Sequence, residues 1–275
     1  MAINPLQQYF RQPKIFLKLP TLGVYNQQGS IDGAADNLPV FGMTGMDEIL
    51  VKTPDALLNG EATVKIIQSC CPNIKDAWDV SNLDLDALLV AIRIATYGET
   101  MTVAHVCKNC SNEMDFDVSL PGILDHFGRC EFDSKLVYGD LTIKLKPLTY
   151  KEATSFNLEN FAFQKRLAQA VEIQDEEIKQ KHIADIFKEV GELQNRVFMA
   201  GVESVETPQG VVTERAYIKE WLENADKQLF DKLKEHVNKN NEVWRIPENH
   251  IKCDNCGHED NFRIELDQSS FFVNA

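Results

Sequence analysis

The sequence predicts an α+β fold that is mainly helical and carries short antiparallel strands. Apolar residues recur at helical spacing in several long segments, above all in residues 176–200. Two C-x-x-C pairs, at positions 107–110 and 253–256, are each followed by residues that alternate between apolar and polar, as strands do. Because 142 residues separate the two pairs, we expect one split cysteine unit with a helical insertion between its halves.

The composition is that of an ordinary globular protein. The 275 residues are enough for one large domain or two small ones, and 44% of them are apolar. The 42 acidic residues outnumber the 28 basic ones, and the net charge of −14 repels nucleic-acid phosphates and anionic membranes. The longest apolar run, Ala87 to Ile92, is too short to span a bilayer, and the N-terminus does not resemble a signal peptide. We therefore expect a soluble protein of the cytoplasm, or of something assembled there, without direct contact to nucleic acid or membrane.

Residues 1–40 are expected to form an extended N-terminal arm. Four prolines in this segment interrupt any helix, and glycines add turns between them. The apolar segments 15–17 and 24–25 would either add short strands or pack on a partner. An arm that simply follows the protein's own surface is an equal alternative.

Residues 41–100 are expected to form a helical region. Thr44 followed by Asp47 is typical of a capped helix start. Thr53-Pro54 marks a second start, with proline at the first helical position, and a further helix should cover residues 61–69.

The last helix of this region has clear signals at both ends. Ser81 is suited to cap its N-terminus, and Asp84 lies in its first turn. Gly98 directly after Tyr97 is a typical helix stop.

Residues 101–147 change to a strand pattern. Strands over 101–106 and 114–120 should flank the first cysteine pair. A hairpin is expected over 131–138 and 141–146, around the turn Tyr138-Gly139-Asp140.

Residues 148–247 are expected to be the helical insertion, and residues 248–275 to hold the second cysteine pair with a C-terminal strand and tail. Thr149 with Glu152 forms a second capping pattern, which should begin the insertion. A turn is expected at Thr207-Pro208-Gln209-Gly210. The expected helices cover residues 176–200, 214–224 and 227–238.

The two cysteine pairs belong to a repeated unit. Residues 107–120 align without gaps with residues 253–266. Besides the cysteines, the identical positions are Asn109/Asn255, Glu113/Glu259, Phe116/Phe262 and Leu120/Leu266. Each unit is therefore predicted to be a turn that carries two thiolates, followed by a strand in which apolar and polar residues alternate.

This pattern predicts a structural Zn²⁺ held by Cys107, Cys110, Cys253 and Cys256. Two thiolates on one tight turn occupy two corners of a tetrahedron, and two such turns supply four soft ligands. Gly257 permits the positive φ that such turns often need. Zinc ribbons usually have about 15–20 residues between their pairs, so the ribbon here would be split by the insertion.

Other interpretations of the cysteines are less well supported. A redox C-x-x-C would need a helix after its first cysteine, an iron–sulfur cluster is compatible with the ligands alone, and four thiolates leave a catalytic zinc no open position. We expect the nearby histidines to be surface residues or neighbours of the ligands, and the remaining cysteines to be small buried apolar residues. The histidines are His105, His250 and His258, and the cysteines are Cys70, Cys71 and Cys130.

The sequence offers no catalytic constellation, so we expect a protein that is not an enzyme. It contains no P-loop, no G-x-G-x-x-G turn, no H-E-x-x-H and no G-x-S-x-G. Asp84 and Asp86 resemble an acid pair, but carboxylates in the first turn of a helix are favoured by the helix dipole, which is the better account of them.

Several segments resemble the baseplate protein family of T-even-like contractile-tailed bacteriophages. The resemblance covers most of the chain, is strongest over 15–130 and 250–272, and over 150–245 is one of pattern only. The segments are Leu19–Gly23, Leu38–Gly60 (LPVFGMTGMDEILVKTPDALLNG), Ile66–Ile74, Ile92–Glu99, Cys253–Gly257 and Ser270–Phe272.

The resemblance implies a structural or assembly component of the baseplate hub that binds other hub and tail proteins and has no enzymatic activity. Such a protein would be found in the host cytoplasm during assembly and in the tail baseplate of the virion. One alternative is a tail-assembly chaperone for the tape-measure protein. The stoichiometry of the assembly stays open.

Two further hypotheses come from the cysteine pattern. A zinc-ribbon adaptor of nucleic-acid machinery would bind a polymerase rather than DNA, because the net charge is −14. A metal or thiol enzyme would need an open coordination position or an activated cysteine. The long helix over 176–200 would dock helical partners, with simple core packing as its alternative.

Overall fold

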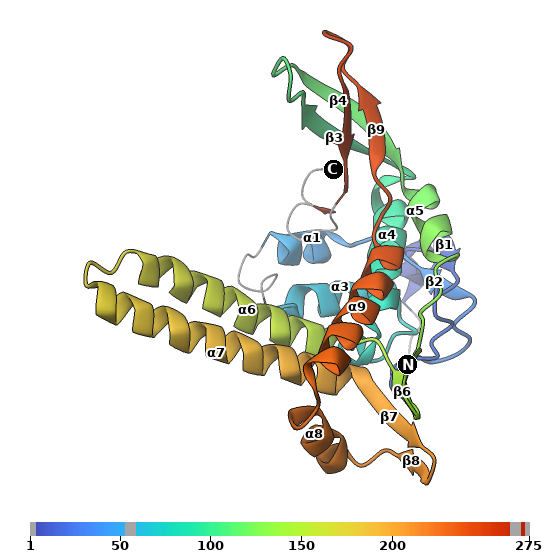
Figure 1. Cartoon of the computed structure of the whole chain (residues 1–275). Coiled ribbons are helices and arrows are strands. Elements are labelled where there is room, and N and C mark those ends of the chain that lie inside the picture. The colour runs from blue at the N-terminus through green and yellow to red at the C-terminus, as the bar shows by residue number, and fades with distance from the viewer. Residues whose placement is uncertain (1–3, 53–58, 265–270, 273–275) are drawn as a thin grey trace. The chain divides into compact units, whose positions relative to one another are not determined.

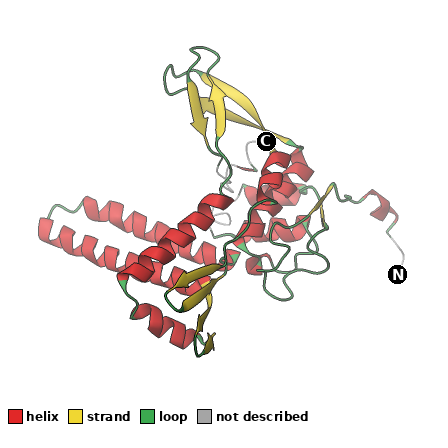
Figure 2. Ribbon diagram, turned by 45° about the vertical axis from the view of Figure 1, so that its right-hand side comes forward, coloured by secondary structure: helices red, strands yellow, loops and turns green. Residues whose placement is uncertain are grey.

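The computed structural model describes residues 4–52, 59–264 and 271–272. The fold is mixed α+β: helices form its largest part, and the strands form short antiparallel sheets of two or four strands (Figures 1 and 2). The predicted fold class is therefore confirmed. The chain divides into two compact units, one of residues Met1–Cys130 with Trp244–Ala275 and the other of Glu131–Val243.

The first unit begins with a short 3-10 helix and a two-stranded sheet that lead into a helical core. Pro5–Tyr9 form the 3-10 helix η1, and β1 (Ile15–Leu17) pairs antiparallel with β2 (Leu38–Val40). The core helices are α1 (Gly45–Val51), α3 (Glu61–Cys70), the 3-10 helix η2 (Ala77–Asp79) and α4 (Asn82–Tyr97).

Helix α4 lies at the centre of this core. It is buried on nearly all sides from Leu85 to Ala95, so it lacks the single apolar stripe of a surface helix. Its ends are those the sequence predicts: the Ser81 hydroxyl accepts a hydrogen bond from the Leu83 amide, and Gly98 ends the helix with a φ of 104°.

The N-terminal segment is fastened to the helices by two charged side chains. Arg11 donates to the carbonyl oxygens of Gly42 and Ser69 and lies 3.7 Å from the carboxylate of Asp47. Asp84, fully buried, accepts from the amide of Thr21 and from its hydroxyl. The apolar side chains of the segment that are buried in the core are Leu17, Leu19, Leu38 and Val40.

A buried arginine holds the described part of the C-terminal tail. The Arg93 guanidinium lies 5.4 Å from the ring centre of Tyr97 and 5.2 Å from that of Phe271, and it donates to the Phe271 carbonyl. Phe271 and Phe272 are 3% and 5% exposed, so the tail completes the core around α4.

Two β-hairpins and a short helix complete the first unit. Strand β3 (Thr100–Val106) pairs with β4 (Glu113–Ser119), and β9 (Asn249–Lys252) pairs with β10 (Glu259–Phe262). Helix α5 (Leu120–Phe127) follows β4 directly.

The second unit combines a four-stranded sheet with helices. The antiparallel order is β5–β6–β7–β8. Its strands are β5 (Lys135–Tyr138), β6 (Leu141–Leu145), β7 (Val202–Thr207) and β8 (Gly210–Val212), and its helices are α6 (Tyr150–Val171), α7 (Glu176–Gly201), α8 (Arg215–Glu223) and α9 (Lys227–Trp244), the last ending at the boundary of the unit.

The core of the second unit lies between the sheet and helices α8 and α9. Ile143 of the sheet is fully buried and belongs to the same cluster as Ile218, Leu222, Leu229 and Leu233 of these helices. Burial of side chains of this size stabilises a fold by roughly 1.5–3 kcal/mol each.

Helices α6 and α7 form an antiparallel hairpin (Figure 1). Arg166 makes a bidentate ion pair with Glu189, and Arg196 pairs with Glu159 in the same way. On α7, Ile186, Leu193 and Phe198 are buried, which is the core packing that we considered as the alternative to docking. Ile178 and Phe187 on the same helix are 50% and 61% exposed.

Most predicted elements are present. The capped starts at Thr44 and Thr149 are complete capping boxes. The helix start at Thr53-Pro54 falls outside the described residues. The sequence analysis missed β2, α5, β7, β8 and β9, and it ended α9 too early. The short strand considered at residues 24–25 is wrong, because these residues form a turn. Within the described ranges, no helix combines the length and apolar content needed to cross a bilayer.

Candidate metal centre

The first cysteine pair lies on the turn between β3 and β4. The amide of Cys107 donates to the carbonyl of Asn112 at 2.9 Å, and the amide of Ser111 donates to the carbonyl of Cys107 at 2.9 Å. Ser111 has a φ of 55°, a conformation that costs a non-glycine residue energy. The turn therefore projects both thiols from one end of the hairpin.

The second pair repeats this turn between β9 and β10. The amide of Cys253 donates to the carbonyl of His258 at 2.8 Å, and the amide of Gly257 donates to the carbonyl of Cys253 at 2.8 Å. Gly257 takes the place of Ser111 and has a φ of 71°, as its sequence position predicts. The repeat in the sequence is thus also a repeat of backbone hydrogen bonds.

All four sulfur atoms come together, each within 4.8 Å of the others. Cys107 Sγ lies 3.8 Å from Cys256 Sγ, and Cys110 Sγ lies 3.6 Å from Cys253 Sγ. A tetrahedral zinc with bonds of about 2.3 Å has sulfur–sulfur edges of about 3.8 Å. These separations exclude disulfides, and the four-sulfur cluster is able to hold a metal ion such as zinc.

Each turn also donates a hydrogen bond to a sulfur of the other turn. The Asn109 amide nitrogen lies 3.5 Å from Cys256 Sγ, and the Asn255 amide nitrogen lies 3.6 Å from Cys110 Sγ. Hydrogen bonds from the Asn109 side chain, from the His258 backbone and from the neighbouring thiols together lower the pKa of the Cys256 thiol to about 6. The exchange follows from the repeat, because both asparagines hold the same position between their cysteines.

Behind the sulfurs, the two hairpins pack on each other (Figures 1 and 2). The rings of Phe116 and Phe262, which occupy equivalent positions in the repeat, meet edge to face at 4.2 Å between their centres. Asp260 accepts from Lys108 at 2.7 Å and from His105 at 3.2 Å. The Lys108 ammonium holds the pKa of the Asp260 carboxyl below its usual range.

The comparisons with known proteins identify the family. A family model described as T4 bacteriophage base plate protein matches residues 46–273. The chain belongs to this family. No curated protein and no solved structure matches the chain.

The family match confirms the resemblance seen in the sequence and gives the chain a coarse role. This member of the T4 baseplate family is a phage baseplate protein, a structural class that is typically without enzymatic activity and that binds other baseplate proteins in the virion tail. The matched residues include both cysteine pairs and the whole insertion between them.

The other cysteines and histidines singled out in the sequence lie outside the four-sulfur cluster. Cys70 and Cys71 are fully buried, and burial raises the pKa of Cys70 to about 12 and that of Cys71 further. Cys130 is half-buried beside His126 rather than fully buried. His105 contacts Asp260, while His250 and His258 are exposed.

Asp84 and Asp86 do not form a catalytic pair. Asp84 lies in the first turn of α4 as expected, but its carboxylate is occupied by Thr21 and Asn26. Burial raises the pKa of Asp84, although the hydrogen bonds from Thr21 and Asn26 act in the opposite direction. Burial also raises the pKa of Asp86 to about 7. Asp84 therefore fastens the N-terminal segment, a role that the dipole explanation missed.

The sequence analysis did not single out Asp260 and Lys108, although the comparison of the two repeat units contains a signal for Asp260. In the repeat, Asp260 takes the place of Met114, so a carboxylate occupies a strand position that faces the partner hairpin. A polar residue at an inward strand position needs a partner, and Lys108 and His105 supply it.

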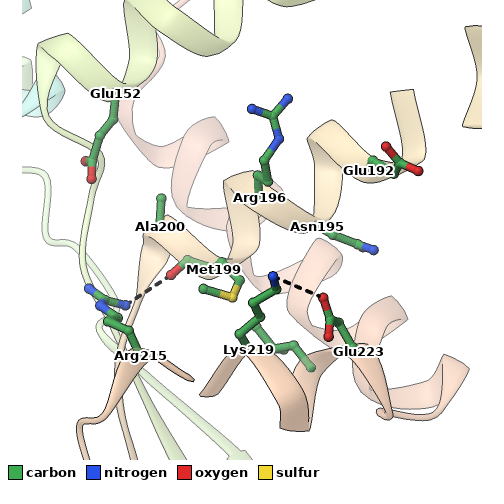
Figure 3. A pocket seen from close by; sticks show the side chains of 10 residues that line it. Glu152, Glu192, Asn195, Arg196, Met199, Ala200, Arg215, Lys219 and Glu223 are labelled. Atoms are coloured by element: carbon green, nitrogen blue, oxygen red, sulfur yellow. Dashed lines mark hydrogen bonds and ion pairs between the residues drawn. The ribbon is translucent and has the colours of Figure 1, made fainter. Parts of the chain in front are cut away.

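The second unit contains an open pocket of about 590 Å³ between α7 and α8 (Figure 3). Arg215 donates to the Met199 carbonyl, and Lys219 pairs with Glu223 at 3.7 Å. The described residues that line the pocket include no cysteine, histidine or serine. The arrangement is one of paired surface charges around the apolar side chains of Met199, Ala200 and Leu222.

Proposed function

We propose that this chain is a structural or assembly component of the baseplate hub, that it acts by binding other hub and tail proteins, and that a structural zinc stabilises it. The observation that carries the proposal is the family match over residues 46–273. The proposed ligands are Cys107, Cys110, Cys253 and Cys256, on the basis of their number, type and separations.

The role of the metal would be thermodynamic. A zinc ion that binds only the folded chain contributes its binding free energy to folding, on the order of 10 kcal/mol for a four-thiolate site. Each close sulfur pair joins one turn to the other, so the ion would join the two hairpins. Four thiolate ligands fill the coordination shell, which argues for a structural rather than a catalytic ion.

The N-terminal arm is the proposed partner-binding element. On the N-terminal side of the anchor at Arg11, Leu6 and Tyr9 of the 3-10 helix and Phe10 directly after it have 61%, 76% and 55% of their surface exposed. Large apolar side chains gathered on a short exposed segment favour a protein interface. The first ten residues carry no charged side chain, so they add nothing to the electrostatic repulsion between this acidic chain and an acidic partner.

A tail-assembly chaperone for the tape-measure protein is the second candidate, because it would use the same binding chemistry. The acidic outer face of β4, which exposes Glu113, Asp115 and Asp117, disfavours an adaptor that touches nucleic acid. The second candidate differs from the first in two observable properties: a chaperone would bind the tape-measure protein alone, and it would leave the particle after assembly.

Purification of the tagged chain from cells that make the tail components tests the proposal. We expect one zinc per chain and co-purifying hub proteins, and we expect the chain in mature particles. Co-purification with the tape-measure protein alone, without the chain in particles, would indicate the chaperone. Replacement of Leu6, Tyr9 and Phe10 by serine should abolish co-purification, whereas serine at the exposed Val137, Ile178 and Val211 should not. Co-purification of neither hub nor tape-measure proteins would contradict the proposal.

A further inference from the structure

A row of uncharged residues runs along α7, on the side of the hairpin opposite to its ion pairs. Arg166 pairs with Glu189 and Arg196 with Glu159, so both pairs join α6 and α7 along one side. An α-helix turns by about 100° per residue, which places a second set of α7 residues on the other side. Helix α7 has nine charged residues, and none belongs to this set. We call the set the uncharged row, and its members are Gln180, Ala184, Phe187, Gly191, Gln194 and Phe198.

The uncharged row is covered at the base of the hairpin and open further out (Figure 1). At the base, Phe198 is 7% exposed, and its ring centre lies 6.0 Å from that of Phe230 on α9. About three helical turns towards the tip, Phe187 is 61% exposed. Between them, a Cβ added at Gly191 would meet no atom within 4 Å. Helix α9 therefore covers the base of the row and leaves an exposed ring beside an open position.

This ring and this open position are complementary to each other. Phe187 and Gly191 lie one turn apart in the same row, so a large side chain alternates with none. If two copies of α7 pack antiparallel about a two-fold axis midway between these residues, Phe187 of each copy lies against Gly191 of the other. A contact with two-fold symmetry uses the same patch on both subunits, as this arrangement does. A glycine inside a helix lowers its stability, and the close approach of a second helix would account for it here.

Charge also favours a second copy as the occupant of this surface. Two chains that each carry a net charge of −14 repel each other, and near a two-fold axis charged residues meet their own like-charged copies. The uncharged row avoids both costs. Residues 150–201 contribute only −2 to the net charge, and Asn160, Gln164 and Ala168 on the same side of α6 are also uncharged.

We propose that two copies of this chain associate through the uncharged row, with Phe187 of each copy packed on Gly191 of the other. The pairing brings two helical hairpins together as a four-helix arrangement, in which the row is buried. The inference depends neither on the zinc site nor on the proposed place in the hub.

Sedimentation equilibrium of the full-length protein tests the pairing. The wild type should be a dimer, and Phe187→Ala should weaken dimerisation at least about thirtyfold, because each dimer loses two aromatic anchors. Gly191→Glu should give a monomer, since it fills the open position and adds a charge to the row. Thermal unfolding of dilute protein should show no loss of stability for Gly191→Glu, because glutamate favours a helix more than glycine does. Ile178→Ala is the control: Ile178 is 50% exposed on the side of α7 that carries Arg196, and its loss should leave the dimer intact.

An exchange of the two residues tests the two-fold geometry itself. The double variant Phe187→Ala/Gly191→Phe places the ring where the glycine was and a small residue where the ring was, so it should restore dimerisation that each single change weakens. A monomeric wild type would overturn the inference, and it would do so equally if a helix of another tail protein occupied the row. A dimer that persists in Gly191→Glu, or a double variant that stays monomeric, would also contradict it.

Discussion

The two cysteine turns have the same sequence pattern, but the hairpins that carry them differ in length and burial. The first turn is flanked by β3 and β4, which pair over seven residues and bury Met101 and Val118. The second is flanked by β9 and β10, which pair over four residues only. An isolated hairpin of this size is at best marginally stable in water. We therefore expect the second turn to depend more strongly than the first on the proposed metal and on its partner hairpin.

Loss of the metal should produce the largest difference in stability between the two hairpins. Cys253→Ser should abolish zinc binding and remove most of the metal's contribution, on the order of 10 kcal/mol. Amide exchange should then accelerate throughout β9–β10, while β3–β4 keeps most of its protection. Metal analysis and hydrogen exchange measure both effects. Cys130→Ser, outside the cluster, should retain zinc, and an unchanged melting temperature and metal content in Cys253→Ser would refute the prediction.

The aromatic contact between the hairpins should have the next largest effect. Phe116→Ala and Phe262→Ala each remove a half-buried ring, and each should cost about 2 kcal/mol, below the values for fully buried phenylalanines. The double variant should cost less than the sum by about 1 kcal/mol, since the rings contact each other. Urea unfolding measures all three variants, and strict additivity would mean that the ring contact contributes nothing.

Substitution of the glycine in the second turn and of the serine in the first should change the stability by smaller amounts and in opposite directions. Gly257→Ala places a side chain at a φ of 71° and should destabilise the protein by about 1 kcal/mol. Ser111→Gly relieves the same conformation at a φ of 55° and should be neutral or stabilise by a few tenths of a kcal/mol. Thermal unfolding of the zinc-loaded protein measures both signs. Equal destabilisation by both changes would mean that the two turns do not have the same backbone conformation.

Asp260 breaks the repeat and should produce the smallest effect, which depends on pH. Its pKa is lowered in the folded state, so its contribution to stability is present above the carboxyl's unfolded pKa and is lost as the pH falls through the folded pKa. Asp260→Asn should lower the urea midpoint at pH 7, and the difference from wild type should vanish in strong acid. Both proteins are loaded with zinc and compared at the same zinc content at each pH. A difference that does not depend on pH would exclude the carboxylate as its cause.

Local chemistry explains which features could be predicted from the sequence. The capping boxes at Thr44 and Thr149 are formed within four residues, and the cysteine turns repeat within a single short unit. Gly257 needs a positive φ because of its own turn, so its conformation could be expected without any knowledge of the fold.

The features that escaped prediction depend on contacts between distant residues. Strand β7 continues directly from α7 and is a strand because it pairs with β6, about sixty residues earlier. Asp84 meets Thr21, which lies 63 positions away, so its helix position alone suggested only a dipole effect. Asp133 and Asn240 exchange hydrogen bonds across 107 positions of the chain, and neither residue belongs to a recognisable motif.

The central claim is that two distant turns form one four-thiolate zinc site. X-ray absorption at the zinc edge of the purified full-length protein, combined with metal analysis, tests this most directly. The account predicts one zinc per chain with four sulfur neighbours at about 2.3 Å. Protein without zinc, or zinc whose neighbours include nitrogen or oxygen in place of one of the four sulfurs, would contradict it.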